Sequence, residues 1–177
     1  MLRSLTNPWI GTDGYDCFAC NPHNPIGLKM KFWVDTDTDN VISIVPLSSH
    51  HQGWTDTLHG GLQATMMDEI CSWQIHYRLG TSGVTSTLNM HYHHPVDTRL
   101  PYVVVRVEIT NRRRRIIDLH ATLSTPDGTL CSEADAIFFC FPNAKVAEMH
   151  FAPCLATGDP ISLEEAINKS LESRVYR

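Results

Sequence analysis

The sequence predicts an α+β protein in which an antiparallel sheet of about six strands wraps around one long central helix. The helix is expected from about residue 61 to residue 78, where the chain is apolar around most of the helical circumference, which is typical of a helix covered on several sides. Six short apolar segments are joined by short connections, which favour antiparallel pairing. A chain of 177 residues is long enough to bury this core in one domain.

Three regions follow one another along the chain. Residues 1–27 are rich in Asn, Pro and Gly and predict a loop that wraps around the domain. Residues 28–142 hold the predicted helix and strands, and residues 143–177 form a C-terminal extension. Within that extension, residues 162–173 predict a short helix with Ser162 as its N-cap and Glu165 at the third helical position.

The strands are predicted from the alternation of apolar and polar residues and from the turn residues between them. In chain order they are residues 28–34, 41–45, 84–94, 102–109, 117–123 and 131–141. In the third strand, one face is expected to hold Val84, Leu88, Met90 and Tyr92. Residues 48–58 predict an irregular loop, and Pro126-Asp127-Gly128 predicts a hairpin turn between the last two strands.

The charge balance and the cysteines limit the classes of function. Nineteen acidic residues against 14 basic ones give a formal net charge of −5, which argues against general nucleic-acid binding. The six cysteines are scattered, which suits a reducing cytosol better than secretion. The N-terminus lacks the apolar run of a signal peptide, and no segment approaches a membrane-spanning length. We therefore expect a cytoplasmic protein that binds neither nucleic acid nor membrane.

The most informative motif is His59-Gly60-Gly61, followed by Asp68 within the predicted helix. Two glycines at a helix start leave bare backbone N–H groups at its positive end, where they can hold an oxyanion. Asp68 lies eight residues beyond Gly60. A carboxylate near such donors indicates a site for attack on a carbonyl group. Glu69 lies about 100° further around the helix and is expected to face solvent or a partner.

Residues 57–69, Thr-Leu-His-Gly-Gly-Leu-Gln-Ala-Thr-Met-Met-Asp-Glu, resemble the hotdog-fold thioesterases of the phenylacetate-pathway (PaaI-like) type. Two further stretches carry the resemblance, from Gly83-Val84-Thr85 through Asn89-Met90-His91-Tyr92 to Pro95, and Cys17-Phe18-Ala19-Cys20 with Asn24-Pro25-Ile26-Gly27-Leu28. The resemblance implies a hotdog fold and hydrolysis of an acyl-CoA thioester with no cofactor and no metal. It also implies a homodimer, or a tetramer of two dimers, with active sites at the subunit interface.

The same resemblance implies roles for single residues. The Gly60 N–H polarises the thioester carbonyl, and Asp68 acts as general base or nucleophile. His59 borders the site, where a structural bond to the backbone is favoured over proton transfer, and Gly61 lies beside the substrate. Thr85 occupies the position of a hydroxyl that the facing subunit supplies to place the water, and an ordinary strand threonine is the alternative. Where some relatives carry an Asn, this chain has Gly53.

Four consecutive arginines, from Arg112 to Arg115, are expected at the turn between two strands. Coenzyme A carries three phosphates, and the arginine fork fits phosphate well. In the relatives that the chain resembles, this turn lies along the nucleotide end of the coenzyme, although it often holds a glycine that is missing here. Arg112, Arg113 and Arg114 are therefore candidates for substrate binding, with a solvated turn as the alternative.

Other signals leave alternatives open. Cys17 and Cys20 form a C-x-x-C pair, for which buried loop thiols are the default, because zinc needs two more ligands and His23 is one nearby candidate. His91 and His93 share a strand face, but no acidic partner lies at a useful spacing. A non-catalytic acyl-CoA-binding module and, less favoured, an enoyl-CoA hydratase are the alternatives to hydrolysis.

Overall fold

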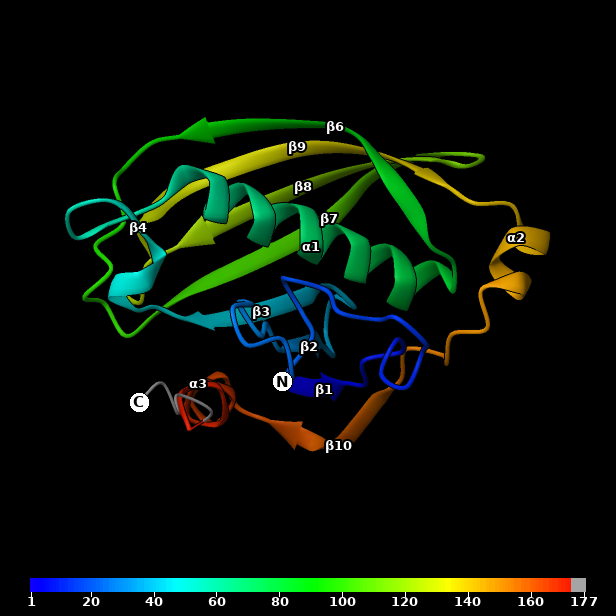
Figure 1. Ribbon diagram of the computed structural model, residues 1–177, viewed down its shortest axis with the longest axis horizontal. Helices are drawn as coiled ribbons and strands as arrows, with labels where there is room; N and C mark the ends of the chain where they lie inside the picture. The colour runs from blue at the N-terminus through cyan, green and yellow to red at the C-terminus, as the bar shows by residue number, and fades with distance from the viewer. Residues whose placement is uncertain (173–177) are drawn as a thin grey trace.

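The structure is a computed structural model that describes residues 1–172 (Figure 1). One long helix, α1, crosses the face of an eight-stranded sheet of order β10-β1-β2-β3-β7-β8-β9-β6. All neighbouring strands in this sheet are antiparallel. The strands are β1 (Leu2–Leu5), β2 (Phe32–Asp35), β3 (Val41–Pro46), β6 (Gly83–Tyr92), β7 (Tyr102–Arg113), β8 (Ile116–Ser124), β9 (Leu130–Cys140) and β10 (Ala156–Ile161). The predicted α+β arrangement is confirmed.

The expectation of about six strands was wrong, because both ends of the chain add a strand to the sheet. β1 lies in the segment that we expected to be a loop throughout, and β10 lies in the C-terminal extension. β1 pairs with β2 on one side and with β10 on the other. β10 has the sequence Ala-Thr-Gly-Asp-Pro-Ile, which reads as a turn. Its proline is tolerated because β10 is an edge strand, where one row of backbone groups needs no partner.

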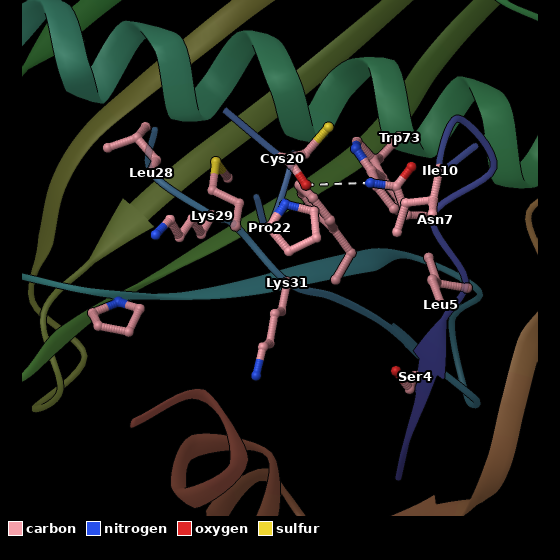
Figure 2. A pocket seen from close by; sticks show the side chains of 13 residues that line it. Ser4, Leu5, Asn7, Ile10, Cys20, Pro22, Leu28, Lys29, Lys31 and Trp73 are labelled. Atoms are coloured by element: carbon pink, nitrogen blue, oxygen red, sulfur yellow. Dashed lines mark hydrogen bonds between the residues drawn. The ribbon is translucent and has the colours of Figure 1, made fainter. Parts of the chain in front are cut away.

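The N-terminal segment after β1 folds over α1 and the end of β2, and a cavity of about 470 Å³ lies beneath it (Figure 2). The Asn7 side-chain amide donates to the Cys20 carbonyl at 3.2 Å and ties two parts of this segment together. Trp73 of α1 and Phe32 of β2 form part of the cavity wall. Their rings stack with centroids 4.0 Å apart. The segment is therefore a packed layer of the domain.

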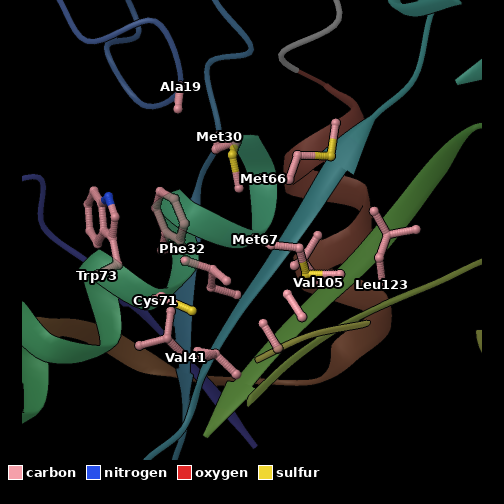
Figure 3. Close-up of a cluster of buried hydrophobic side chains, with 14 of the residues drawn as sticks. Ala19, Met30, Phe32, Val41, Met66, Met67, Cys71, Trp73, Val105 and Leu123 are labelled. Atoms are coloured by element: carbon pink, nitrogen blue, oxygen red, sulfur yellow. The ribbon is translucent and has the colours of Figure 1, made fainter. Parts of the chain in front are cut away.

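α1 (Gly60–Leu79) ends at Gly80, whose φ of 59° is the left-handed conformation that favours glycine at a helix C-terminus. Figure 3 shows Met66, Met67, Cys71 and Trp73 of the helix packed against residues of the sheet. His76 is buried between the rings of Trp9 and Phe151 at centroid distances of 4.7 and 4.5 Å. Burial lowers the pKa of His76.

A second helix covers the opposite face of the sheet. α3 (Leu163–Leu171) places Ala166 in a second apolar cluster formed by Leu2, Trp33, Ile42, Ile44 and Val104. Ser162 caps α3 by accepting a hydrogen bond from the Glu165 N–H at 3.1 Å, and the Ser162 N–H in turn donates to the Glu165 carboxylate at 2.8 Å, as predicted. Ser173, the last residue of the predicted helix, lies outside the described residues. Among residues 1–172, no helix has both the length and the apolar character needed to cross a bilayer.

The pairing of β6 with β9 contains a bulge between Thr85 and Thr87, which changes the faces that we expected. Leu88, Met90 and Tyr92 stand opposite Ala136, Ala134 and Ser132, which are buried beneath α1. Thr85 stands opposite the buried Phe138, whereas Val84 is 52% exposed. The extra residue shifts the alternation by one. Thr85, and not Val84, therefore shares the helix side of the sheet.

The remaining connections contain a hairpin turn, a small two-stranded sheet and a short helix. The turn at Pro126-Asp127-Gly128 links β8 to β9 as predicted, with a φ of 89° at Gly128. Residues 48–58 are more regular than expected. They form a 3-10 turn (Ser49–His51) and a small hairpin of β4 (Gln52–Trp54) and β5 (Thr57–Leu58) that leads into α1. α2 (Asn143–Glu148) lies in the connection between β9 and β10.

Candidate active site

The N-terminus of α1 presents one backbone donor outward. His59 is the N-cap, and its Nδ1 accepts a hydrogen bond from the Gly61 N–H at 2.8 Å. Its carbonyl accepts from the N–H groups of Leu62 and Gln63 at 3.0 and 3.1 Å. Of the first four N–H groups, only that of Gly60 finds no acceptor among the described residues. His59 therefore has the capping role that we favoured, and Gly60 has the free donor.

Two neighbours shape the space around this donor. The Tyr92 hydroxyl donates to the Gly60 carbonyl at 2.9 Å, and the Tyr92 ring lies 3.4 Å from where a Cβ on Gly60 would stand. A Cβ on Gly53 would come within 2.7 Å of the His59 ring. Gly53 thus lets His59 reach its capping position, and an Asn there would displace the ring. Tyr92 was predicted only as an apolar strand residue, and its place at the end of β6 is the signal that could have identified it.

Asp68 lies in the middle of α1 and accepts a 2.5 Å hydrogen bond from the Thr85 hydroxyl. Both residues belong to one chain. The Thr85 hydroxyl thus reaches Asp68 within one chain, whereas we expected the facing subunit to supply it. The cause is the bulge in β6, which turns the Thr85 side chain toward the helix. The bond occupies Asp68 Oδ1 and leaves Oδ2 available for another partner.

Gly60 and Asp68 do not meet within one chain. Eight residues of helix separate them, which corresponds to about 12 Å along the axis. Reacting groups must approach to about 3–3.5 Å, or through a single water, to act on one bond. A single chain therefore presents two half-sites, one with Gly60 and Tyr92 and the other with Asp68 and Thr85.

The arginine turn joins β7 to β8. Arg113 Nη2 donates to both carboxylate oxygens of Asp118 at 2.9 Å. The Arg115 guanidinium lies over the Phe139 ring, 4.6 Å from its centroid. Arg112, Arg114 and Arg115 line a cavity of about 160 Å³ that also contacts Leu79, the last residue of α1, and Thr81. Arg113 is thus held by its own hairpin, while the other three arginines border a concave surface.

The register connects this turn to the half-site at Thr85. The Arg115 carbonyl accepts from the Cys140 N–H at 2.7 Å, and Cys140 stands opposite Gly83 in the sheet. Gly83 is two residues before Thr85 on β6. The arginines therefore lie at the same end of the sheet as Thr85, away from the end that holds Gly60.

Glu69, for which we expected solvent or a partner, has two partners in its own chain. Its Oε1 accepts a hydrogen bond from Trp73 Nε1 at 2.9 Å, and its Oε2 lies 3.7 Å from the Cys17 sulfur beneath the N-terminal segment. Burial raises the pKa of Glu69 to about 7, and the charge of Cys17 adds to the rise. The Asp68 carboxylate therefore faces Thr85 of β6, whereas the Glu69 carboxylate faces the N-terminal segment.

Cys17 and Cys20 both contribute to this buried group. Hydrogen bonds from the Cys20 thiol and from the N–H groups of Cys20 and Ala19 lower the pKa of Cys17 to about 6, against the opposing effect of burial. The bond to Cys17 and burial raise the pKa of Cys20. The Tyr15 hydroxyl lies 3.0 Å from the Cys20 sulfur. The two sulfur atoms thus lie next to the Glu69 carboxylate.

His93, just after β6, has an acidic partner that the sequence did not suggest. His93 Nε2 lies 3.1 Å from Glu133 Oε1. His120 is 2.9 Å from Asp135 and 3.7 Å from Glu133. These side chains are partly exposed and come from neighbouring strands, so strand pairing, and not sequence spacing, brings them together.

Comparison with known proteins identifies the architecture. A family profile described as the thioesterase superfamily matches residues 55–132, which contain α1 and both half-sites. The fold is a thioesterase hotdog fold. No curated protein matches the chain in sequence.

Solved structures agree with this fold. A thioesterase superfamily protein matches with a TM-score of 0.60 and 22% identity, over 68% of this chain and 60% of that one. A Bacillus halodurans protein solved with CoA matches with a TM-score of 0.52 and 24% identity, over 56% of this chain and 66% of that one. Zebrafish thioesterase superfamily member 2 matches with a TM-score of 0.57 and 20% identity, over 64% of this chain and 82% of that one. This chain thus spans less than two thirds of the first two proteins.

Proposed function

We propose that this chain is an acyl-CoA thioesterase of the PaaI-like type whose active sites form between two copies of the chain. The observation that carries the proposal is the presence of two groups on one helix. The first is the free N-terminal donor at Gly60, and the second is the carboxylate of Asp68, which the Thr85 hydroxyl orients. The match to the thioesterase superfamily profile supports hydrolysis of a thioester. The similar Bacillus halodurans protein, solved with CoA, supports the choice of an acyl-CoA substrate.

The free edge of β6 supports a dimer that joins the half-sites. β6 is ten residues long and, among residues 1–172, β9 is its one strand partner, so its other side carries backbone groups that no strand pairs. Tyr92, near its end, is 53% exposed. In an antiparallel pair of two β6 strands, the Thr85 end of one copy lies beside the Tyr92 end of the other. Asp68 of one copy thereby approaches Gly60 of its partner. Two such dimers would form the tetramer.

The proposed reaction needs only acyl and proton transfer. The Gly60 N–H and the positive end of α1 stabilise the oxyanion that forms when the thioester carbonyl is attacked. Asp68 Oδ2 takes a proton from the attacking water, while the Thr85 hydroxyl holds Oδ1. The carbon–sulfur bond then breaks, and the proton passes to the CoA thiolate. In the alternative route, Asp68 attacks the carbonyl directly and water hydrolyses the resulting anhydride.

The test of this function is release of free thiol from acyl-CoA by the purified chain, measured over aryl, short and long acyl groups. Hydrolysis yields one thiol per acyl group consumed. A non-catalytic binding module would saturate with acyl-CoA and release none. A hydratase would add water to the double bond of an enoyl-CoA and keep the thioester intact. Absence of thiol release across the whole panel would contradict the proposal.

We further propose that the arginine turn binds the phosphates at the nucleotide end of CoA. Replacing Arg112 and Arg114 together by Ala is expected to raise the KM for acyl-CoA about tenfold and to leave kcat nearly unchanged, as for loss of charge-assisted bonds far from the chemistry. Steady-state kinetics measures both constants. The KM of the unmodified chain should also rise with salt, because the contact is exposed and ionic.

Two controls accompany this prediction. Arg113→Ala should change the KM less, because the Arg113 guanidinium is held by Asp118. Acyl-pantetheine lacks the nucleotide phosphates, so the double variant and the unmodified chain should hydrolyse it alike. An equal KM for full acyl-CoA in both proteins would mean that the arginines form only a solvated turn.

A further inference from the structure

The buried group of Cys17, Cys20 and Glu69 has the composition and the spacing of a metal site. Their two sulfur atoms and one carboxylate oxygen lie within 4.8 Å of one another. The two cysteines come from the N-terminal segment, and Glu69 comes from α1, 52 residues after Cys17. Donor atoms that surround one tetrahedral ion at 2.0–2.3 Å are separated by distances of this order. His23, the ligand that the sequence suggested, is not in this group.

The loop that carries the cysteines is shaped to hold a thiolate. The Cys20 N–H donates to the Cys17 sulfur at 3.4 Å, so the turn between the two residues brings both sulfur atoms to the same side. Cys20 is buried and Cys17 is partly buried. A metal ligand must be deprotonated, and a backbone donor to sulfur favours that form.

Neighbouring groups orient the third ligand and the second cysteine. Trp73 Nε1 holds one oxygen of Glu69 at 2.9 Å, which leaves the other oxygen directed at Cys17. The Tyr15 hydroxyl contacts the Cys20 sulfur at 3.0 Å and is itself held by the Asn7 amide at 2.8 Å. Such outer contacts are the usual support of a metal site.

The cavity of about 470 Å³ gives access to this group. Cys20, Asn7 and Trp73 all line it, and Figure 2 shows them beneath α1. The cavity does not include Gly60, Asp68 or Thr85, so it is separate from both half-sites. An ion can therefore enter beside Cys20, and water can fill a fourth coordination position.

We propose that Cys17, Cys20 and Glu69 bind one zinc ion, with water as the fourth ligand. Two thiolates and a carboxylate form a ligand set that suits Zn²⁺ better than Mg²⁺ or Ca²⁺, which prefer oxygen alone. The ion ties the N-terminal segment to the middle of α1. Zinc binding at this site takes no part in the proposed thioester hydrolysis and requires no change of the redox state of the cysteines.

Metal binding by the full chain tests the proposal. The protein, without an affinity tag and reduced with a phosphine, is stripped with a chelator and titrated with Zn²⁺ against a chromogenic competitor. We expect one zinc per chain and a higher Tm with zinc than without it. Replacing the zinc by Co²⁺ should give a thiolate-to-cobalt charge-transfer band and intense visible bands of a tetrahedral complex.

Single substitutions separate this site from others. Cys17→Ser and Cys20→Ser should abolish the charge-transfer band or reduce it and weaken zinc binding at least tenfold, and Glu69→Gln should weaken binding at least tenfold while keeping the band. Cys154→Ser, outside the group, and His93→Gln, at the exposed histidines, should leave the affinity unchanged. Failure of the reduced chain to bind zinc, or unchanged binding in both cysteine variants, would overturn the proposal.

Discussion

Replacing Asp68 by Asn is expected to lower kcat for acyl-CoA hydrolysis at least a hundredfold while the chain stays folded. The amide has the shape of the carboxylate and can still accept the Thr85 bond through its oxygen. It cannot take a proton from water or attack the thioester. Loss of one positioned acid or base typically lowers the rate by about 10²–10⁴-fold. Steady-state kinetics, with circular dichroism as the check of folding, gives the result.

Glu69→Gln is the matched control for this variant. It changes the adjacent carboxylate on the same helix, but that carboxylate lies under the N-terminal segment and bonds to Trp73. Its effect on kcat should be much smaller than that of Asp68→Asn. Turnover near that of the unmodified chain in Asp68→Asn, or a larger loss in Glu69→Gln, would mean that the wrong carboxylate was assigned.

Replacing Gly60 by Pro is expected to lower kcat about a hundredfold, because it removes the one backbone donor assigned to the oxyanion. Proline is tolerated at the first helical position, where the N–H has no intrahelical acceptor. His59 has φ −60° and ψ 129°, a conformation that is allowed before proline. Gly60→Ala keeps the N–H, and its Cβ would meet the Tyr92 ring at 3.4 Å, so most activity should remain.

The two inactive variants together test whether the site is shared between subunits. A heterodimer of Asp68→Asn and Gly60→Pro chains, isolated through two different tags, contains one complete site and one doubly defective site if Gly60 and Asp68 act across the interface. It should recover roughly half of the unmodified activity per dimer. If both groups acted within one chain, the heterodimer would be as inactive as its parents. A fully active monomer in sedimentation at assay concentration would also exclude the shared site.

Local signals in the sequence predicted the central elements. α1 was predicted within about one residue at each end, since Gly60-Gly61 and Gly80 mark its boundaries. The alternation of apolar and polar residues predicted the strands β7, β8 and β9, because side chains on a strand repeat every two residues. The turn at Gly128 and the N-cap at Ser162 were also predicted from residues close to them in the sequence.

Elements that depend on distant partners were not predictable in this way. β1 and β10 have no strong alternation. β1 forms by pairing with β2 and β10, and β10 forms by pairing with β1. The bulge at Thr85 is set by how β6 fits against β9, and it decides which face the threonine takes. A sequence pattern read with a fixed period of two misses such a shift.

For the candidate site, the sequence by itself identified the residue types, namely the capped glycine donor at Gly60 and the carboxylate at Asp68. Only the tertiary structure decided their geometry. It bonded Asp68 to Thr85 in one chain, placed Tyr92 over Gly60, and turned Glu69 toward Cys17 and away from solvent. The physical reason is that helix propensity and capping act between residues a few positions apart, whereas these contacts join residues 17 to 52 positions apart through packing of the sheet and the N-terminal segment on α1.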